Sequence, residues 1–200
     1  LGEDVPVEHG ALVEPLSVAL HAVRRSGLQA GDAVAVFGSG PIGLAVIQCA
    51  RVAGAGTIFV SEPRDARRER AADCGATELV DPSTTDPVEY VHSHTDGGVD
   101  VAFEVAGVEP SFNAAVESTA PSGQTTVVSI WEEEVSTHPN TLVLGERTVT
   151  GTLAYLGGPR SDEEYGMVID MLADGRLDPD PFITGRIGLD GIVANGFDRL

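Results

Sequence analysis

The sequence predicts an α/β fold in which a doubly wound, six-stranded parallel sheet carries helices on both faces. Two observations support this prediction. Short apolar runs alternate with segments whose apolar residues recur at helical spacing, and a glycine-rich turn follows the first run and opens a helix. Because a tight turn cannot join neighbouring parallel strands, each helix is expected to form a crossover connection.

The six expected strands are short runs of apolar and β-branched residues bounded by turn-forming residues. They cover residues 33–37, 57–61, 78–80, 99–105, 124–130 and 148–153. The first run, AVAVF, lies between a Gly-Asp step and a Gly-Ser-Gly step. Its unbroken apolar character is typical of a strand that is buried on both faces.

Helices are expected between the strands, over residues 41–52, 64–74, 87–93, 110–119 and 162–173. Pro41 suits the first turn of the first of these helices, and Gly54 suits its end. A further helix over 11–25 precedes the sheet, and 191–200 has the pattern of an amphipathic helix that stops unfinished. We therefore expect both ends to be truncation points within a larger protein.

The composition indicates a globular protein of one domain, or at most two small ones, with 42% apolar and 22% charged residues in 200. The formal net charge is −19, and all basic residues are Arg. The electrostatic field of such a negative charge repels polyanions, so we expect no binding to nucleic acid or to anionic membrane lipid. The acid surplus without Lys favours a halophilic protein, with compositional drift in an acidic mesophile as the alternative.

The two cysteines, Cys49 and Cys74, lie in expected helices without a CxxC motif or a Cys/His cluster. This spacing argues against a disulfide scaffold and predicts buried small hydrophobes in a reducing compartment. No apolar run approaches the ~20 residues that span a bilayer, and no secretory leader is visible. The expected location is therefore the cytoplasm.

The turn after the first strand has the pattern G-x-G-x-x-G, which predicts a site for a dinucleotide pyrophosphate in a Rossmann fold. Its residues are Gly38, Ser39, Gly40, Pro41, Ile42 and Gly43. Gly38 would allow the tight turn, Gly40 would let the backbone approach the pyrophosphate, and Gly43 would let the helix pack closely on the strand. The helix N-terminus would favour the negative charge, although a purely structural glycine turn is the alternative.

An acid is expected about 20 residues beyond such a turn, at the end of the second strand. Glu62 occupies this place. Its carboxylate can accept hydrogen bonds from both hydroxyls of an adenosine ribose and would repel a 2′-phosphate, so NAD is favoured over NADP. Nearby Arg64, Arg67 and Arg68 argue the other way, although a solvated helix face explains Arg64 and Arg68 better.

Together, these residues resemble the medium-chain dehydrogenase/reductase superfamily. The match begins with GDAVAVFGSGPIG at 31–43 and continues through CGA at 74–76, DVAFEVAG at 100–107 and the expected sixth strand at 148–151. Upstream, GALVEPLSVALHAVRR at 10–25 resembles the polyol and butanediol branch of the zinc-dependent members. The resemblance spans nearly the whole chain.

The resemblance implies a two-domain enzyme whose GroES-like catalytic domain, with most of the zinc ligands, is missing from this chain. Residues 1–30 would lead in from that domain, and 31–200 would be the NAD-binding Rossmann domain, truncated at its C-terminus. It also implies that Glu14 is catalytic and faces the zinc, as a ligand or as the holder of the zinc-bound water. On the residues alone, Glu14 is better explained as a first-turn acid stabilised by the helix dipole.

The resemblance further implies a set of contacts with the cofactor. Val18 would lie against the nicotinamide ring, and Arg67 would lie at the adenosine ribose. The loop after the fourth strand and the ends of the fifth and sixth strands would meet the nicotinamide amide. The residues expected there are Val105, Ala106, Ser129, Trp131, Thr152 and Ala154. Core packing is the alternative for Val18, and packing or an interface is equally suited to Trp131.

These implications predict the NAD-binding domain of a zinc-dependent alcohol or polyol dehydrogenase, similar to 2,3-butanediol and sorbitol dehydrogenases. The full enzyme would transfer a hydride between a secondary alcohol and nicotinamide, while this chain alone would be inactive. The alternatives are a zinc-free, NADPH-dependent quinone or enone reductase of the same superfamily and a non-catalytic NAD(H)-sensing module. The expected partners are a small alcohol or polyol and further copies of the chain, in a dimer or tetramer paired at the sixth strand.

Overall fold

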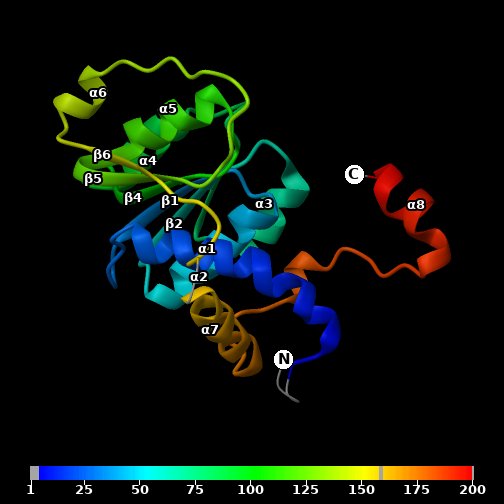
Figure 1. Ribbon diagram of the computed structural model, residues 1–200. Helices are drawn as coiled ribbons and strands as arrows, with labels where there is room; N and C mark the ends of the chain where they lie inside the picture. The colour runs from blue at the N-terminus through cyan, green and yellow to red at the C-terminus, as the bar shows by residue number, and fades with distance from the viewer. Residues whose placement is uncertain (1–4, 158–159, 200) are drawn as a thin grey trace.

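The computed structural model describes residues 5–157 and 160–199, and it confirms the doubly wound parallel sheet (Figure 1). The strand order is β3-β2-β1-β4-β5-β6, and every neighbouring pair is parallel. The order reverses between β1 and β4, where open sheets of this type bind ligands beyond the carboxyl ends of the strands. The strands are β1 (Ala33–Phe37), β2 (Thr57–Ser61), β3 (Glu78–Val80), β4 (Val99–Glu104), β5 (Thr119–Val127) and β6 (Thr148–Gly151).

Helices follow the strands as crossover connections. The α-helices are α1 (Val13–Arg25), α2 (Pro41–Ala53), α3 (Asp65–Asp73), α4 (Pro87–His94), α5 (Glu109–Ser118), α6 (Asn140–Val143), α7 (Ser161–Ala173) and α8 (Ile192–Asn195). Short 3-10 helices cover Val7–Leu12, Asp180–Phe182, Leu189–Gly191 and Phe197–Arg199. The expected helix over 11–25 therefore starts as the end of a 3-10 turn and becomes an α-helix at Val13.

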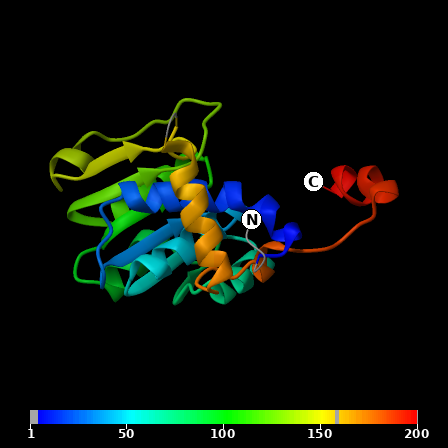
Figure 2. The same cartoon turned by 60° about the horizontal axis from the view of Figure 1, so that its bottom comes forward.

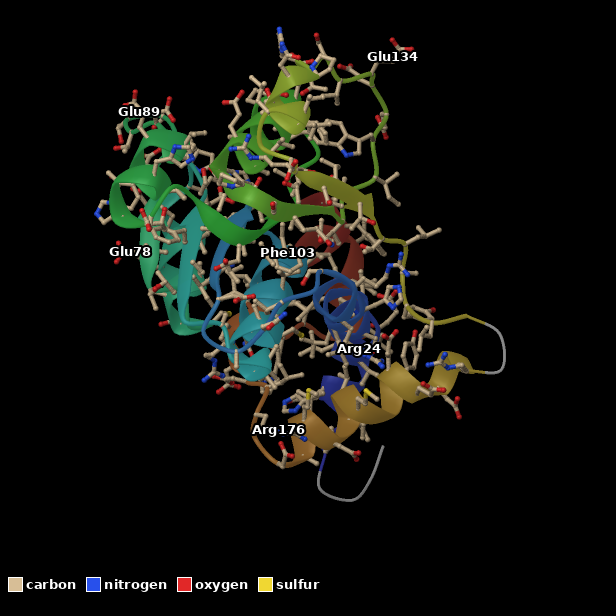
Figure 3. All side chains as sticks on the ribbon, turned by 90° about the vertical axis from the view of Figure 1, so that its left-hand side faces the viewer. Arg24, Glu78, Glu89, Phe103, Glu134 and Arg176 are labelled. Carbon is tan, nitrogen blue, oxygen red and sulfur yellow. The ribbon has the colours of Figure 1, made fainter. Side chains whose placement is uncertain are left out.

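Side chains that alternate along each strand build two cores, one on each face of the sheet. Val34 and Val36 of β1 face a core that includes α1, α2, α3 and α7. Ala35 and Phe37 face the opposite core, which includes α4 and α5. Phe103 of β4 is fully buried in the middle of the molecule (Figure 3). Because α1 packs directly against α2 and α7, the segment before the sheet is part of this hydrophobic layer.

Two predicted elements are wrong in their extent. Strand β5 runs from Thr119 to Val127 rather than over 124–130, and its register shifts against β4 between Val99 and Val101. Its first half, TAPSG, has the residues of a turn, and Ser122 in it has a φ of +63°. Strand β6 ends at Gly151 rather than at 153, because the chain leaves the sheet there.

The amphipathic helix expected over 191–200 is also wrong within the described residues, and Leu200 lies outside them. The segment folds as three short helical pieces, and Gly196 ends α8 after only four residues. Glycine weakens a helix because its backbone has more freedom to lose. The apolar side chains of Leu189, Val193 and Phe197 are exposed along this arm. Figures 1 and 2 show the arm running apart from the sheet and its helices.

The chain between α7 and this arm (residues 189–199) is attached to α2 by the side chain of Gln48. This buried amide on α2 donates to the carbonyl oxygen of Asp178 and accepts from its N–H, each at 2.8 Å. The pair of bonds fixes where the chain leaves α7 and passes over α2.

Among the described residues, no helix has the length and the apolar character that crossing a membrane requires.

Candidate functional site

The glycine turn between β1 and α2 has the geometry that its pattern predicts. Gly38 has a φ of +98°, and a Cβ on it would lie 3.0 Å from the Cβ of Ala106. A Cβ on Gly43 would lie 2.1 Å from the carbonyl oxygen of Gly38, so α2 can begin this close to β1 only with glycine there. A Cβ on Gly40 would meet nothing nearer than Arg67, at 3.9 Å. The turn is therefore packed behind Gly38 and Gly43 and open above Gly40.

The start of α2 presents hydrogen-bond donors to this open space. Pro41 is the exposed first residue of α2, and Ile42 behind it is half-buried. The N–H groups in the first turn of a helix have no acceptor within the helix, and the helix dipole favours an anion beside them. Ser39 is buried, and its hydroxyl donates to the carbonyl oxygen of Arg67 at 3.3 Å. The turn thus combines a helix N-terminus with a small polar wall, which suits a phosphate group.

Glu62, the acid expected at the end of β2, is 3% exposed and joined to the glycine turn. Its Oε2 accepts from the N–H of Ser39 at 3.0 Å, and its Oε1 accepts from the N–H of Arg64 at 3.1 Å. The guanidinium of Arg67 lies 3.8 Å from Oε2. Each carboxylate oxygen can accept more than one hydrogen bond. Glu62 can therefore hold the turn and also accept hydroxyl groups from a ligand.

The three arginines near Glu62 have different surroundings. Arg64 is exposed and Arg67 is half-buried. The prediction of a solvated Arg68 is wrong, because its side chain is 15% exposed and lies 3.5 Å from Asp81. It also pairs with Asp65 and donates to the carbonyl oxygen of Glu62 at 2.6 Å. Arg68 is therefore committed to protein partners at the end of β2.

Two cavities meet at Gly40 and Arg67. The larger, of about 670 Å³, runs from the ends of β1 and β2 to the loop after β4, with Glu62, Val105 and Ala106 in its wall. The smaller, of about 210 Å³, lies between the start of α2, α3 and the segment around Phe182. The arrangement gives an extended site across the carboxyl edge of β1, with the start of α2 at its centre.

Glu104 at the end of β4 organises the loop that lines the larger cavity, and it is fully buried. Its Oε1 accepts from the N–H groups of Ala106 and Gly107 at 2.9 and 2.8 Å, and from the Ser111 hydroxyl at 2.7 Å. Its Oε2 accepts from the hydroxyl of Ser129. One carboxylate therefore joins the loop after β4, the start of α5 and the segment after β5.

The residues expected around the nicotinamide lie on separate segments, and two of them, Val105 and Ala106, line the larger cavity together with Glu62. Val18 is half-buried on α1, Ser129 and Trp131 follow β5, and Thr152 and Ala154 follow β6. The ring of Trp131 packs edge-to-face against Phe112 of α5, with centroids 6.0 Å apart. This contact is what the packing alternative for Trp131 expects. Nothing in the geometry tests the cofactor contacts themselves, so they stay predictions.

Glu14 is an exposed acid in the first turn of α1, beside the aromatic pair Tyr155 and Tyr165. The two rings lie 4.8 Å apart. Burial, a hydrogen bond with Tyr155 and the neighbouring charge of Glu14 raise the pKa of Tyr165 to about 12. Across the described residues, no three His, Cys, Asp or Glu side chains gather as a metal site. Within residues 5–157 and 160–199, Glu14 therefore has no set of neighbouring acids, His or Cys that would complete a zinc site.

The comparison with known proteins agrees with this geometry. Residues 41–174 match the profile of a family described as zinc-binding dehydrogenase. The chain belongs to the zinc-binding dehydrogenase family. It is 44% identical to the (R,R)-butanediol dehydrogenase of Bacillus subtilis (strain 168) over 100% of the chain and 56% of that enzyme. This zinc-binding dehydrogenase chain thus spans about half the length of the curated relatives that it matches.

Solved structures show the same domain within longer chains. The crystal structure of the Bacillus subtilis 2R,3R-butanediol dehydrogenase matches with a TM-score of 0.92 and 44% identity, over 99% of this chain and 55% of that one. A zinc-binding dehydrogenase of Sinorhizobium meliloti 1021, solved with NADP bound, matches with a TM-score of 0.82 and 33% identity. The match covers 96% of this chain and 58% of that one. Both confirm the Rossmann-type sheet.

Two buried acids, Glu104 and Glu164, do not stand out in the sequence. Glu104 is visible only as the last acid of VDVAFEV, and Glu164 only as the last of three consecutive acids early in α7. A charged residue at the end of an otherwise apolar strand, just before a glycine-containing loop, is the one signal that points to Glu104. Glu164 has no such signal, because its neighbours are also acidic and its burial depends on α1.

Proposed function

We propose that this chain is the NAD-binding domain of a zinc-dependent dehydrogenase acting on a secondary alcohol or polyol. The observation that carries the proposal is the buried carboxylate of Glu62, which is bonded to the glycine turn and lines the larger cavity. An acid in this place hydrogen-bonds the adenosine ribose and leaves no room for a 2′-phosphate. Arg68 donates to the carbonyl oxygen of Glu62 and is already paired with Asp65 and Asp81, so it is not free to hold a 2′-phosphate.

The proposed mode of binding follows the two cavities. The adenosine would occupy the larger cavity, with its ribose hydroxyls on Glu62 and with Arg67 beside them. The pyrophosphate would lie on the start of α2, over Gly40, where the backbone is open. The nicotinamide would extend toward Val18 and the segments that follow β5 and β6. When bound, the nicotinamide supplies or accepts the hydride, while this chain binds and orients it.

The substrate and the metal are proposed from the relatives and not from this chain. The Bacillus subtilis relative is a butanediol dehydrogenase, so a small vicinal diol is the first substrate to test. Glu14 would approach a zinc ion whose other ligands come from outside residues 1–200, with 1–30 leading in from the domain that holds them. Loss of Glu14 in the full enzyme should then lower turnover by ~10²–10⁴-fold with little loss of NADH affinity.

Further parts of the proposal concern the protein's surroundings. The free cysteines Cys49 and Cys74 suit a reducing cytoplasm. The outer edge of β6 suits pairing with another copy of the chain, in a dimer or tetramer. A net charge of −19 without Lys suits a concentrated salt solution.

Titration with NADH and NADPH tests the choice of cofactor. Wild-type chain should bind NADH at least ~10-fold more tightly, which corresponds to ~1.4 kcal/mol. Glu62→Ser should lose this preference, whereas the matched control Glu69→Ser, on the exposed face of α3, should keep it. Equal affinities in the wild type would contradict the NAD assignment and favour the NADPH-dependent reductase.

A further inference from the structure

Glu164 of α7 is a buried carboxylate that contacts neither the glycine turn nor the Glu62 cavity. It is 1% exposed and joins two other segments of the chain. Its Oε1 lies 3.0 Å from Nδ1 of His21 and accepts from Nη1 of Arg24 at 3.0 Å. Its Oε2 accepts from the N–H of Leu156 at 2.8 Å. Figure 2 shows α7 lying across α1, and Figure 3 shows Arg24 where these helices meet.

This arrangement does more than hold α1 and α7 together. Apolar packing already joins the two helices, since Val168 of α7 and Leu16, Leu20 and Val23 of α1 share one core. A buried carboxylate is costly unless its hydrogen-bonding capacity is used, and apolar side chains in place of a whole buried ion pair often stabilise a fold equally well. The carboxylate also fixes the position of the loop after β6, because it accepts a hydrogen bond from the N–H of Leu156.

That loop is held in a strained form. Ala154 has a φ of +50°, which costs a non-glycine residue free energy and persists only where the surroundings impose it. The next residue, Tyr155, packs on Tyr165 of α7, and Leu156 is bonded to Glu164. Helix α7 therefore holds Tyr155 and Leu156, which directly follow Ala154 in the loop.

We propose that Glu164 is a positioning residue that sets the nicotinamide half of the site by tying the loop after β6 to α1. The inference rests on the proposed function. Helix α1 carries Glu14 and Val18, and the loop carries Thr152 and Ala154, so the two segments that Glu164 joins are two of those expected around the nicotinamide. His21 and Arg24 occupy the C-terminal half of α1, so Glu164 holds the helix at the end away from Glu14 and Val18.

A pair of ligands separates the two halves of the site. ADP-ribose has the adenosine, the pyrophosphate and the second ribose of NADH but lacks the nicotinamide. By calorimetric titration of the full chain, the wild type should bind NADH more tightly than ADP-ribose. Glu164→Gln should weaken NADH binding on the order of tenfold while ADP-ribose affinity changes by less than about twofold. A general loss of structure would weaken both ligands together.

Glu163→Gln is the matched control, because Glu163 precedes Glu164 and pairs with Arg160 at the surface. It should leave both affinities unchanged. A folded Glu164→Gln chain that binds both ligands normally, or both equally weakly, would overturn the inference, as would a wild type that does not distinguish them. A wild type that binds neither ligand would refute the proposed function instead.

Arg24→Gln covers the case in which Glu164→Gln does not fold. The Arg24 side chain is 38% exposed, so its replacement leaves the core intact and removes one donor from Glu164. The expected change is a weakening of NADH binding by about threefold, again without a change for ADP-ribose. An unchanged NADH affinity in this folded variant would overturn the inference.

Discussion

Replacing Glu104 should destabilise the chain more than replacing any exposed acid. Glu104→Ala leaves the N–H groups of Ala106 and Gly107 and the hydroxyls of Ser111 and Ser129 without their acceptor. The hydroxyls can turn to other acceptors, but the two amides cannot. The two N–H groups are only partly buried, so water can reach them and each costs an amount near the lower end of ~1–3 kcal/mol, which gives an expected loss of ~2 kcal/mol. Domains of this kind are stable by only ~5–15 kcal/mol.

Glu104→Gln should cost less, about 1 kcal/mol, because its amide oxygen still accepts from both N–H groups and the Ser129 hydroxyl can accept from its NH₂ group. Glu89→Ala, on the exposed face of α4 (Figure 3), is the control and should cost less than ~0.5 kcal/mol. Urea unfolding followed by circular dichroism measures the three values. If Glu104→Ala shifts the midpoint by less than the equivalent of ~1 kcal/mol at an unchanged m-value, the carboxylate does not hold the loops.

Three further predictions concern the turn, the buried thiol and the net charge. Gly43→Ala should cost more than ~3 kcal/mol of stability, because its Cβ would lie 2.1 Å from the carbonyl oxygen of Gly38. Gly40→Val should fold normally and lose NADH binding, because only Arg67 lies near a Cβ there. Equal melting temperatures for the two variants would contradict this. Burial raises the pKa of the Cys49 thiol from 9.0 to about 12, so Cys49 in the folded chain should resist iodoacetamide at pH 8.5. The free energy of unfolding should fall as the pH rises above 9.0, because the thiol ionises in the unfolded chain and not in the folded one. Rapid labelling of Cys49 in the folded chain would refute this. The melting temperature should rise between dilute buffer and molar KCl, because screening relieves repulsion in a chain of net charge −19, and a flat response would count against salt adaptation.

The sequence predicts this fold well where burial is uniform along a strand. Strands β1 and β2 have the predicted ends because apolar residues stop where the strand leaves the core. The predicted start of β5 is too late, because only Thr119 pairs with β4 before Gln124 and the residues between them are small, polar or turn-forming. Gly196 stops α8 in a segment whose apolar spacing alone predicts a continuous helix.

The candidate site was predictable where the backbone itself carries the function. Gly38, Gly40 and Gly43 have separate steric roles that spacing reveals, and Glu62 has a fixed place after β2. Glu104 and Glu164 were missed because an acid's burial depends on contacts with distant segments. The side chain of Arg68 was misjudged for the same reason, since Asp81 meets it from the segment after β3.

The start of α2 and Arg67 form a small positive region inside a strongly negative chain, and this has a consequence for the rate of cofactor capture. NADH carries a negative pyrophosphate, so at long range the chain repels the molecule that the turn would hold. The attraction of the helix N-terminus acts within the first turn, well inside a Debye length of ~10 Å at 0.1 M salt. Added salt therefore removes the repulsion sooner than the attraction. The association rate constant of NADH should increase with ionic strength, the reverse of the usual behaviour of a charged ligand meeting an oppositely charged protein.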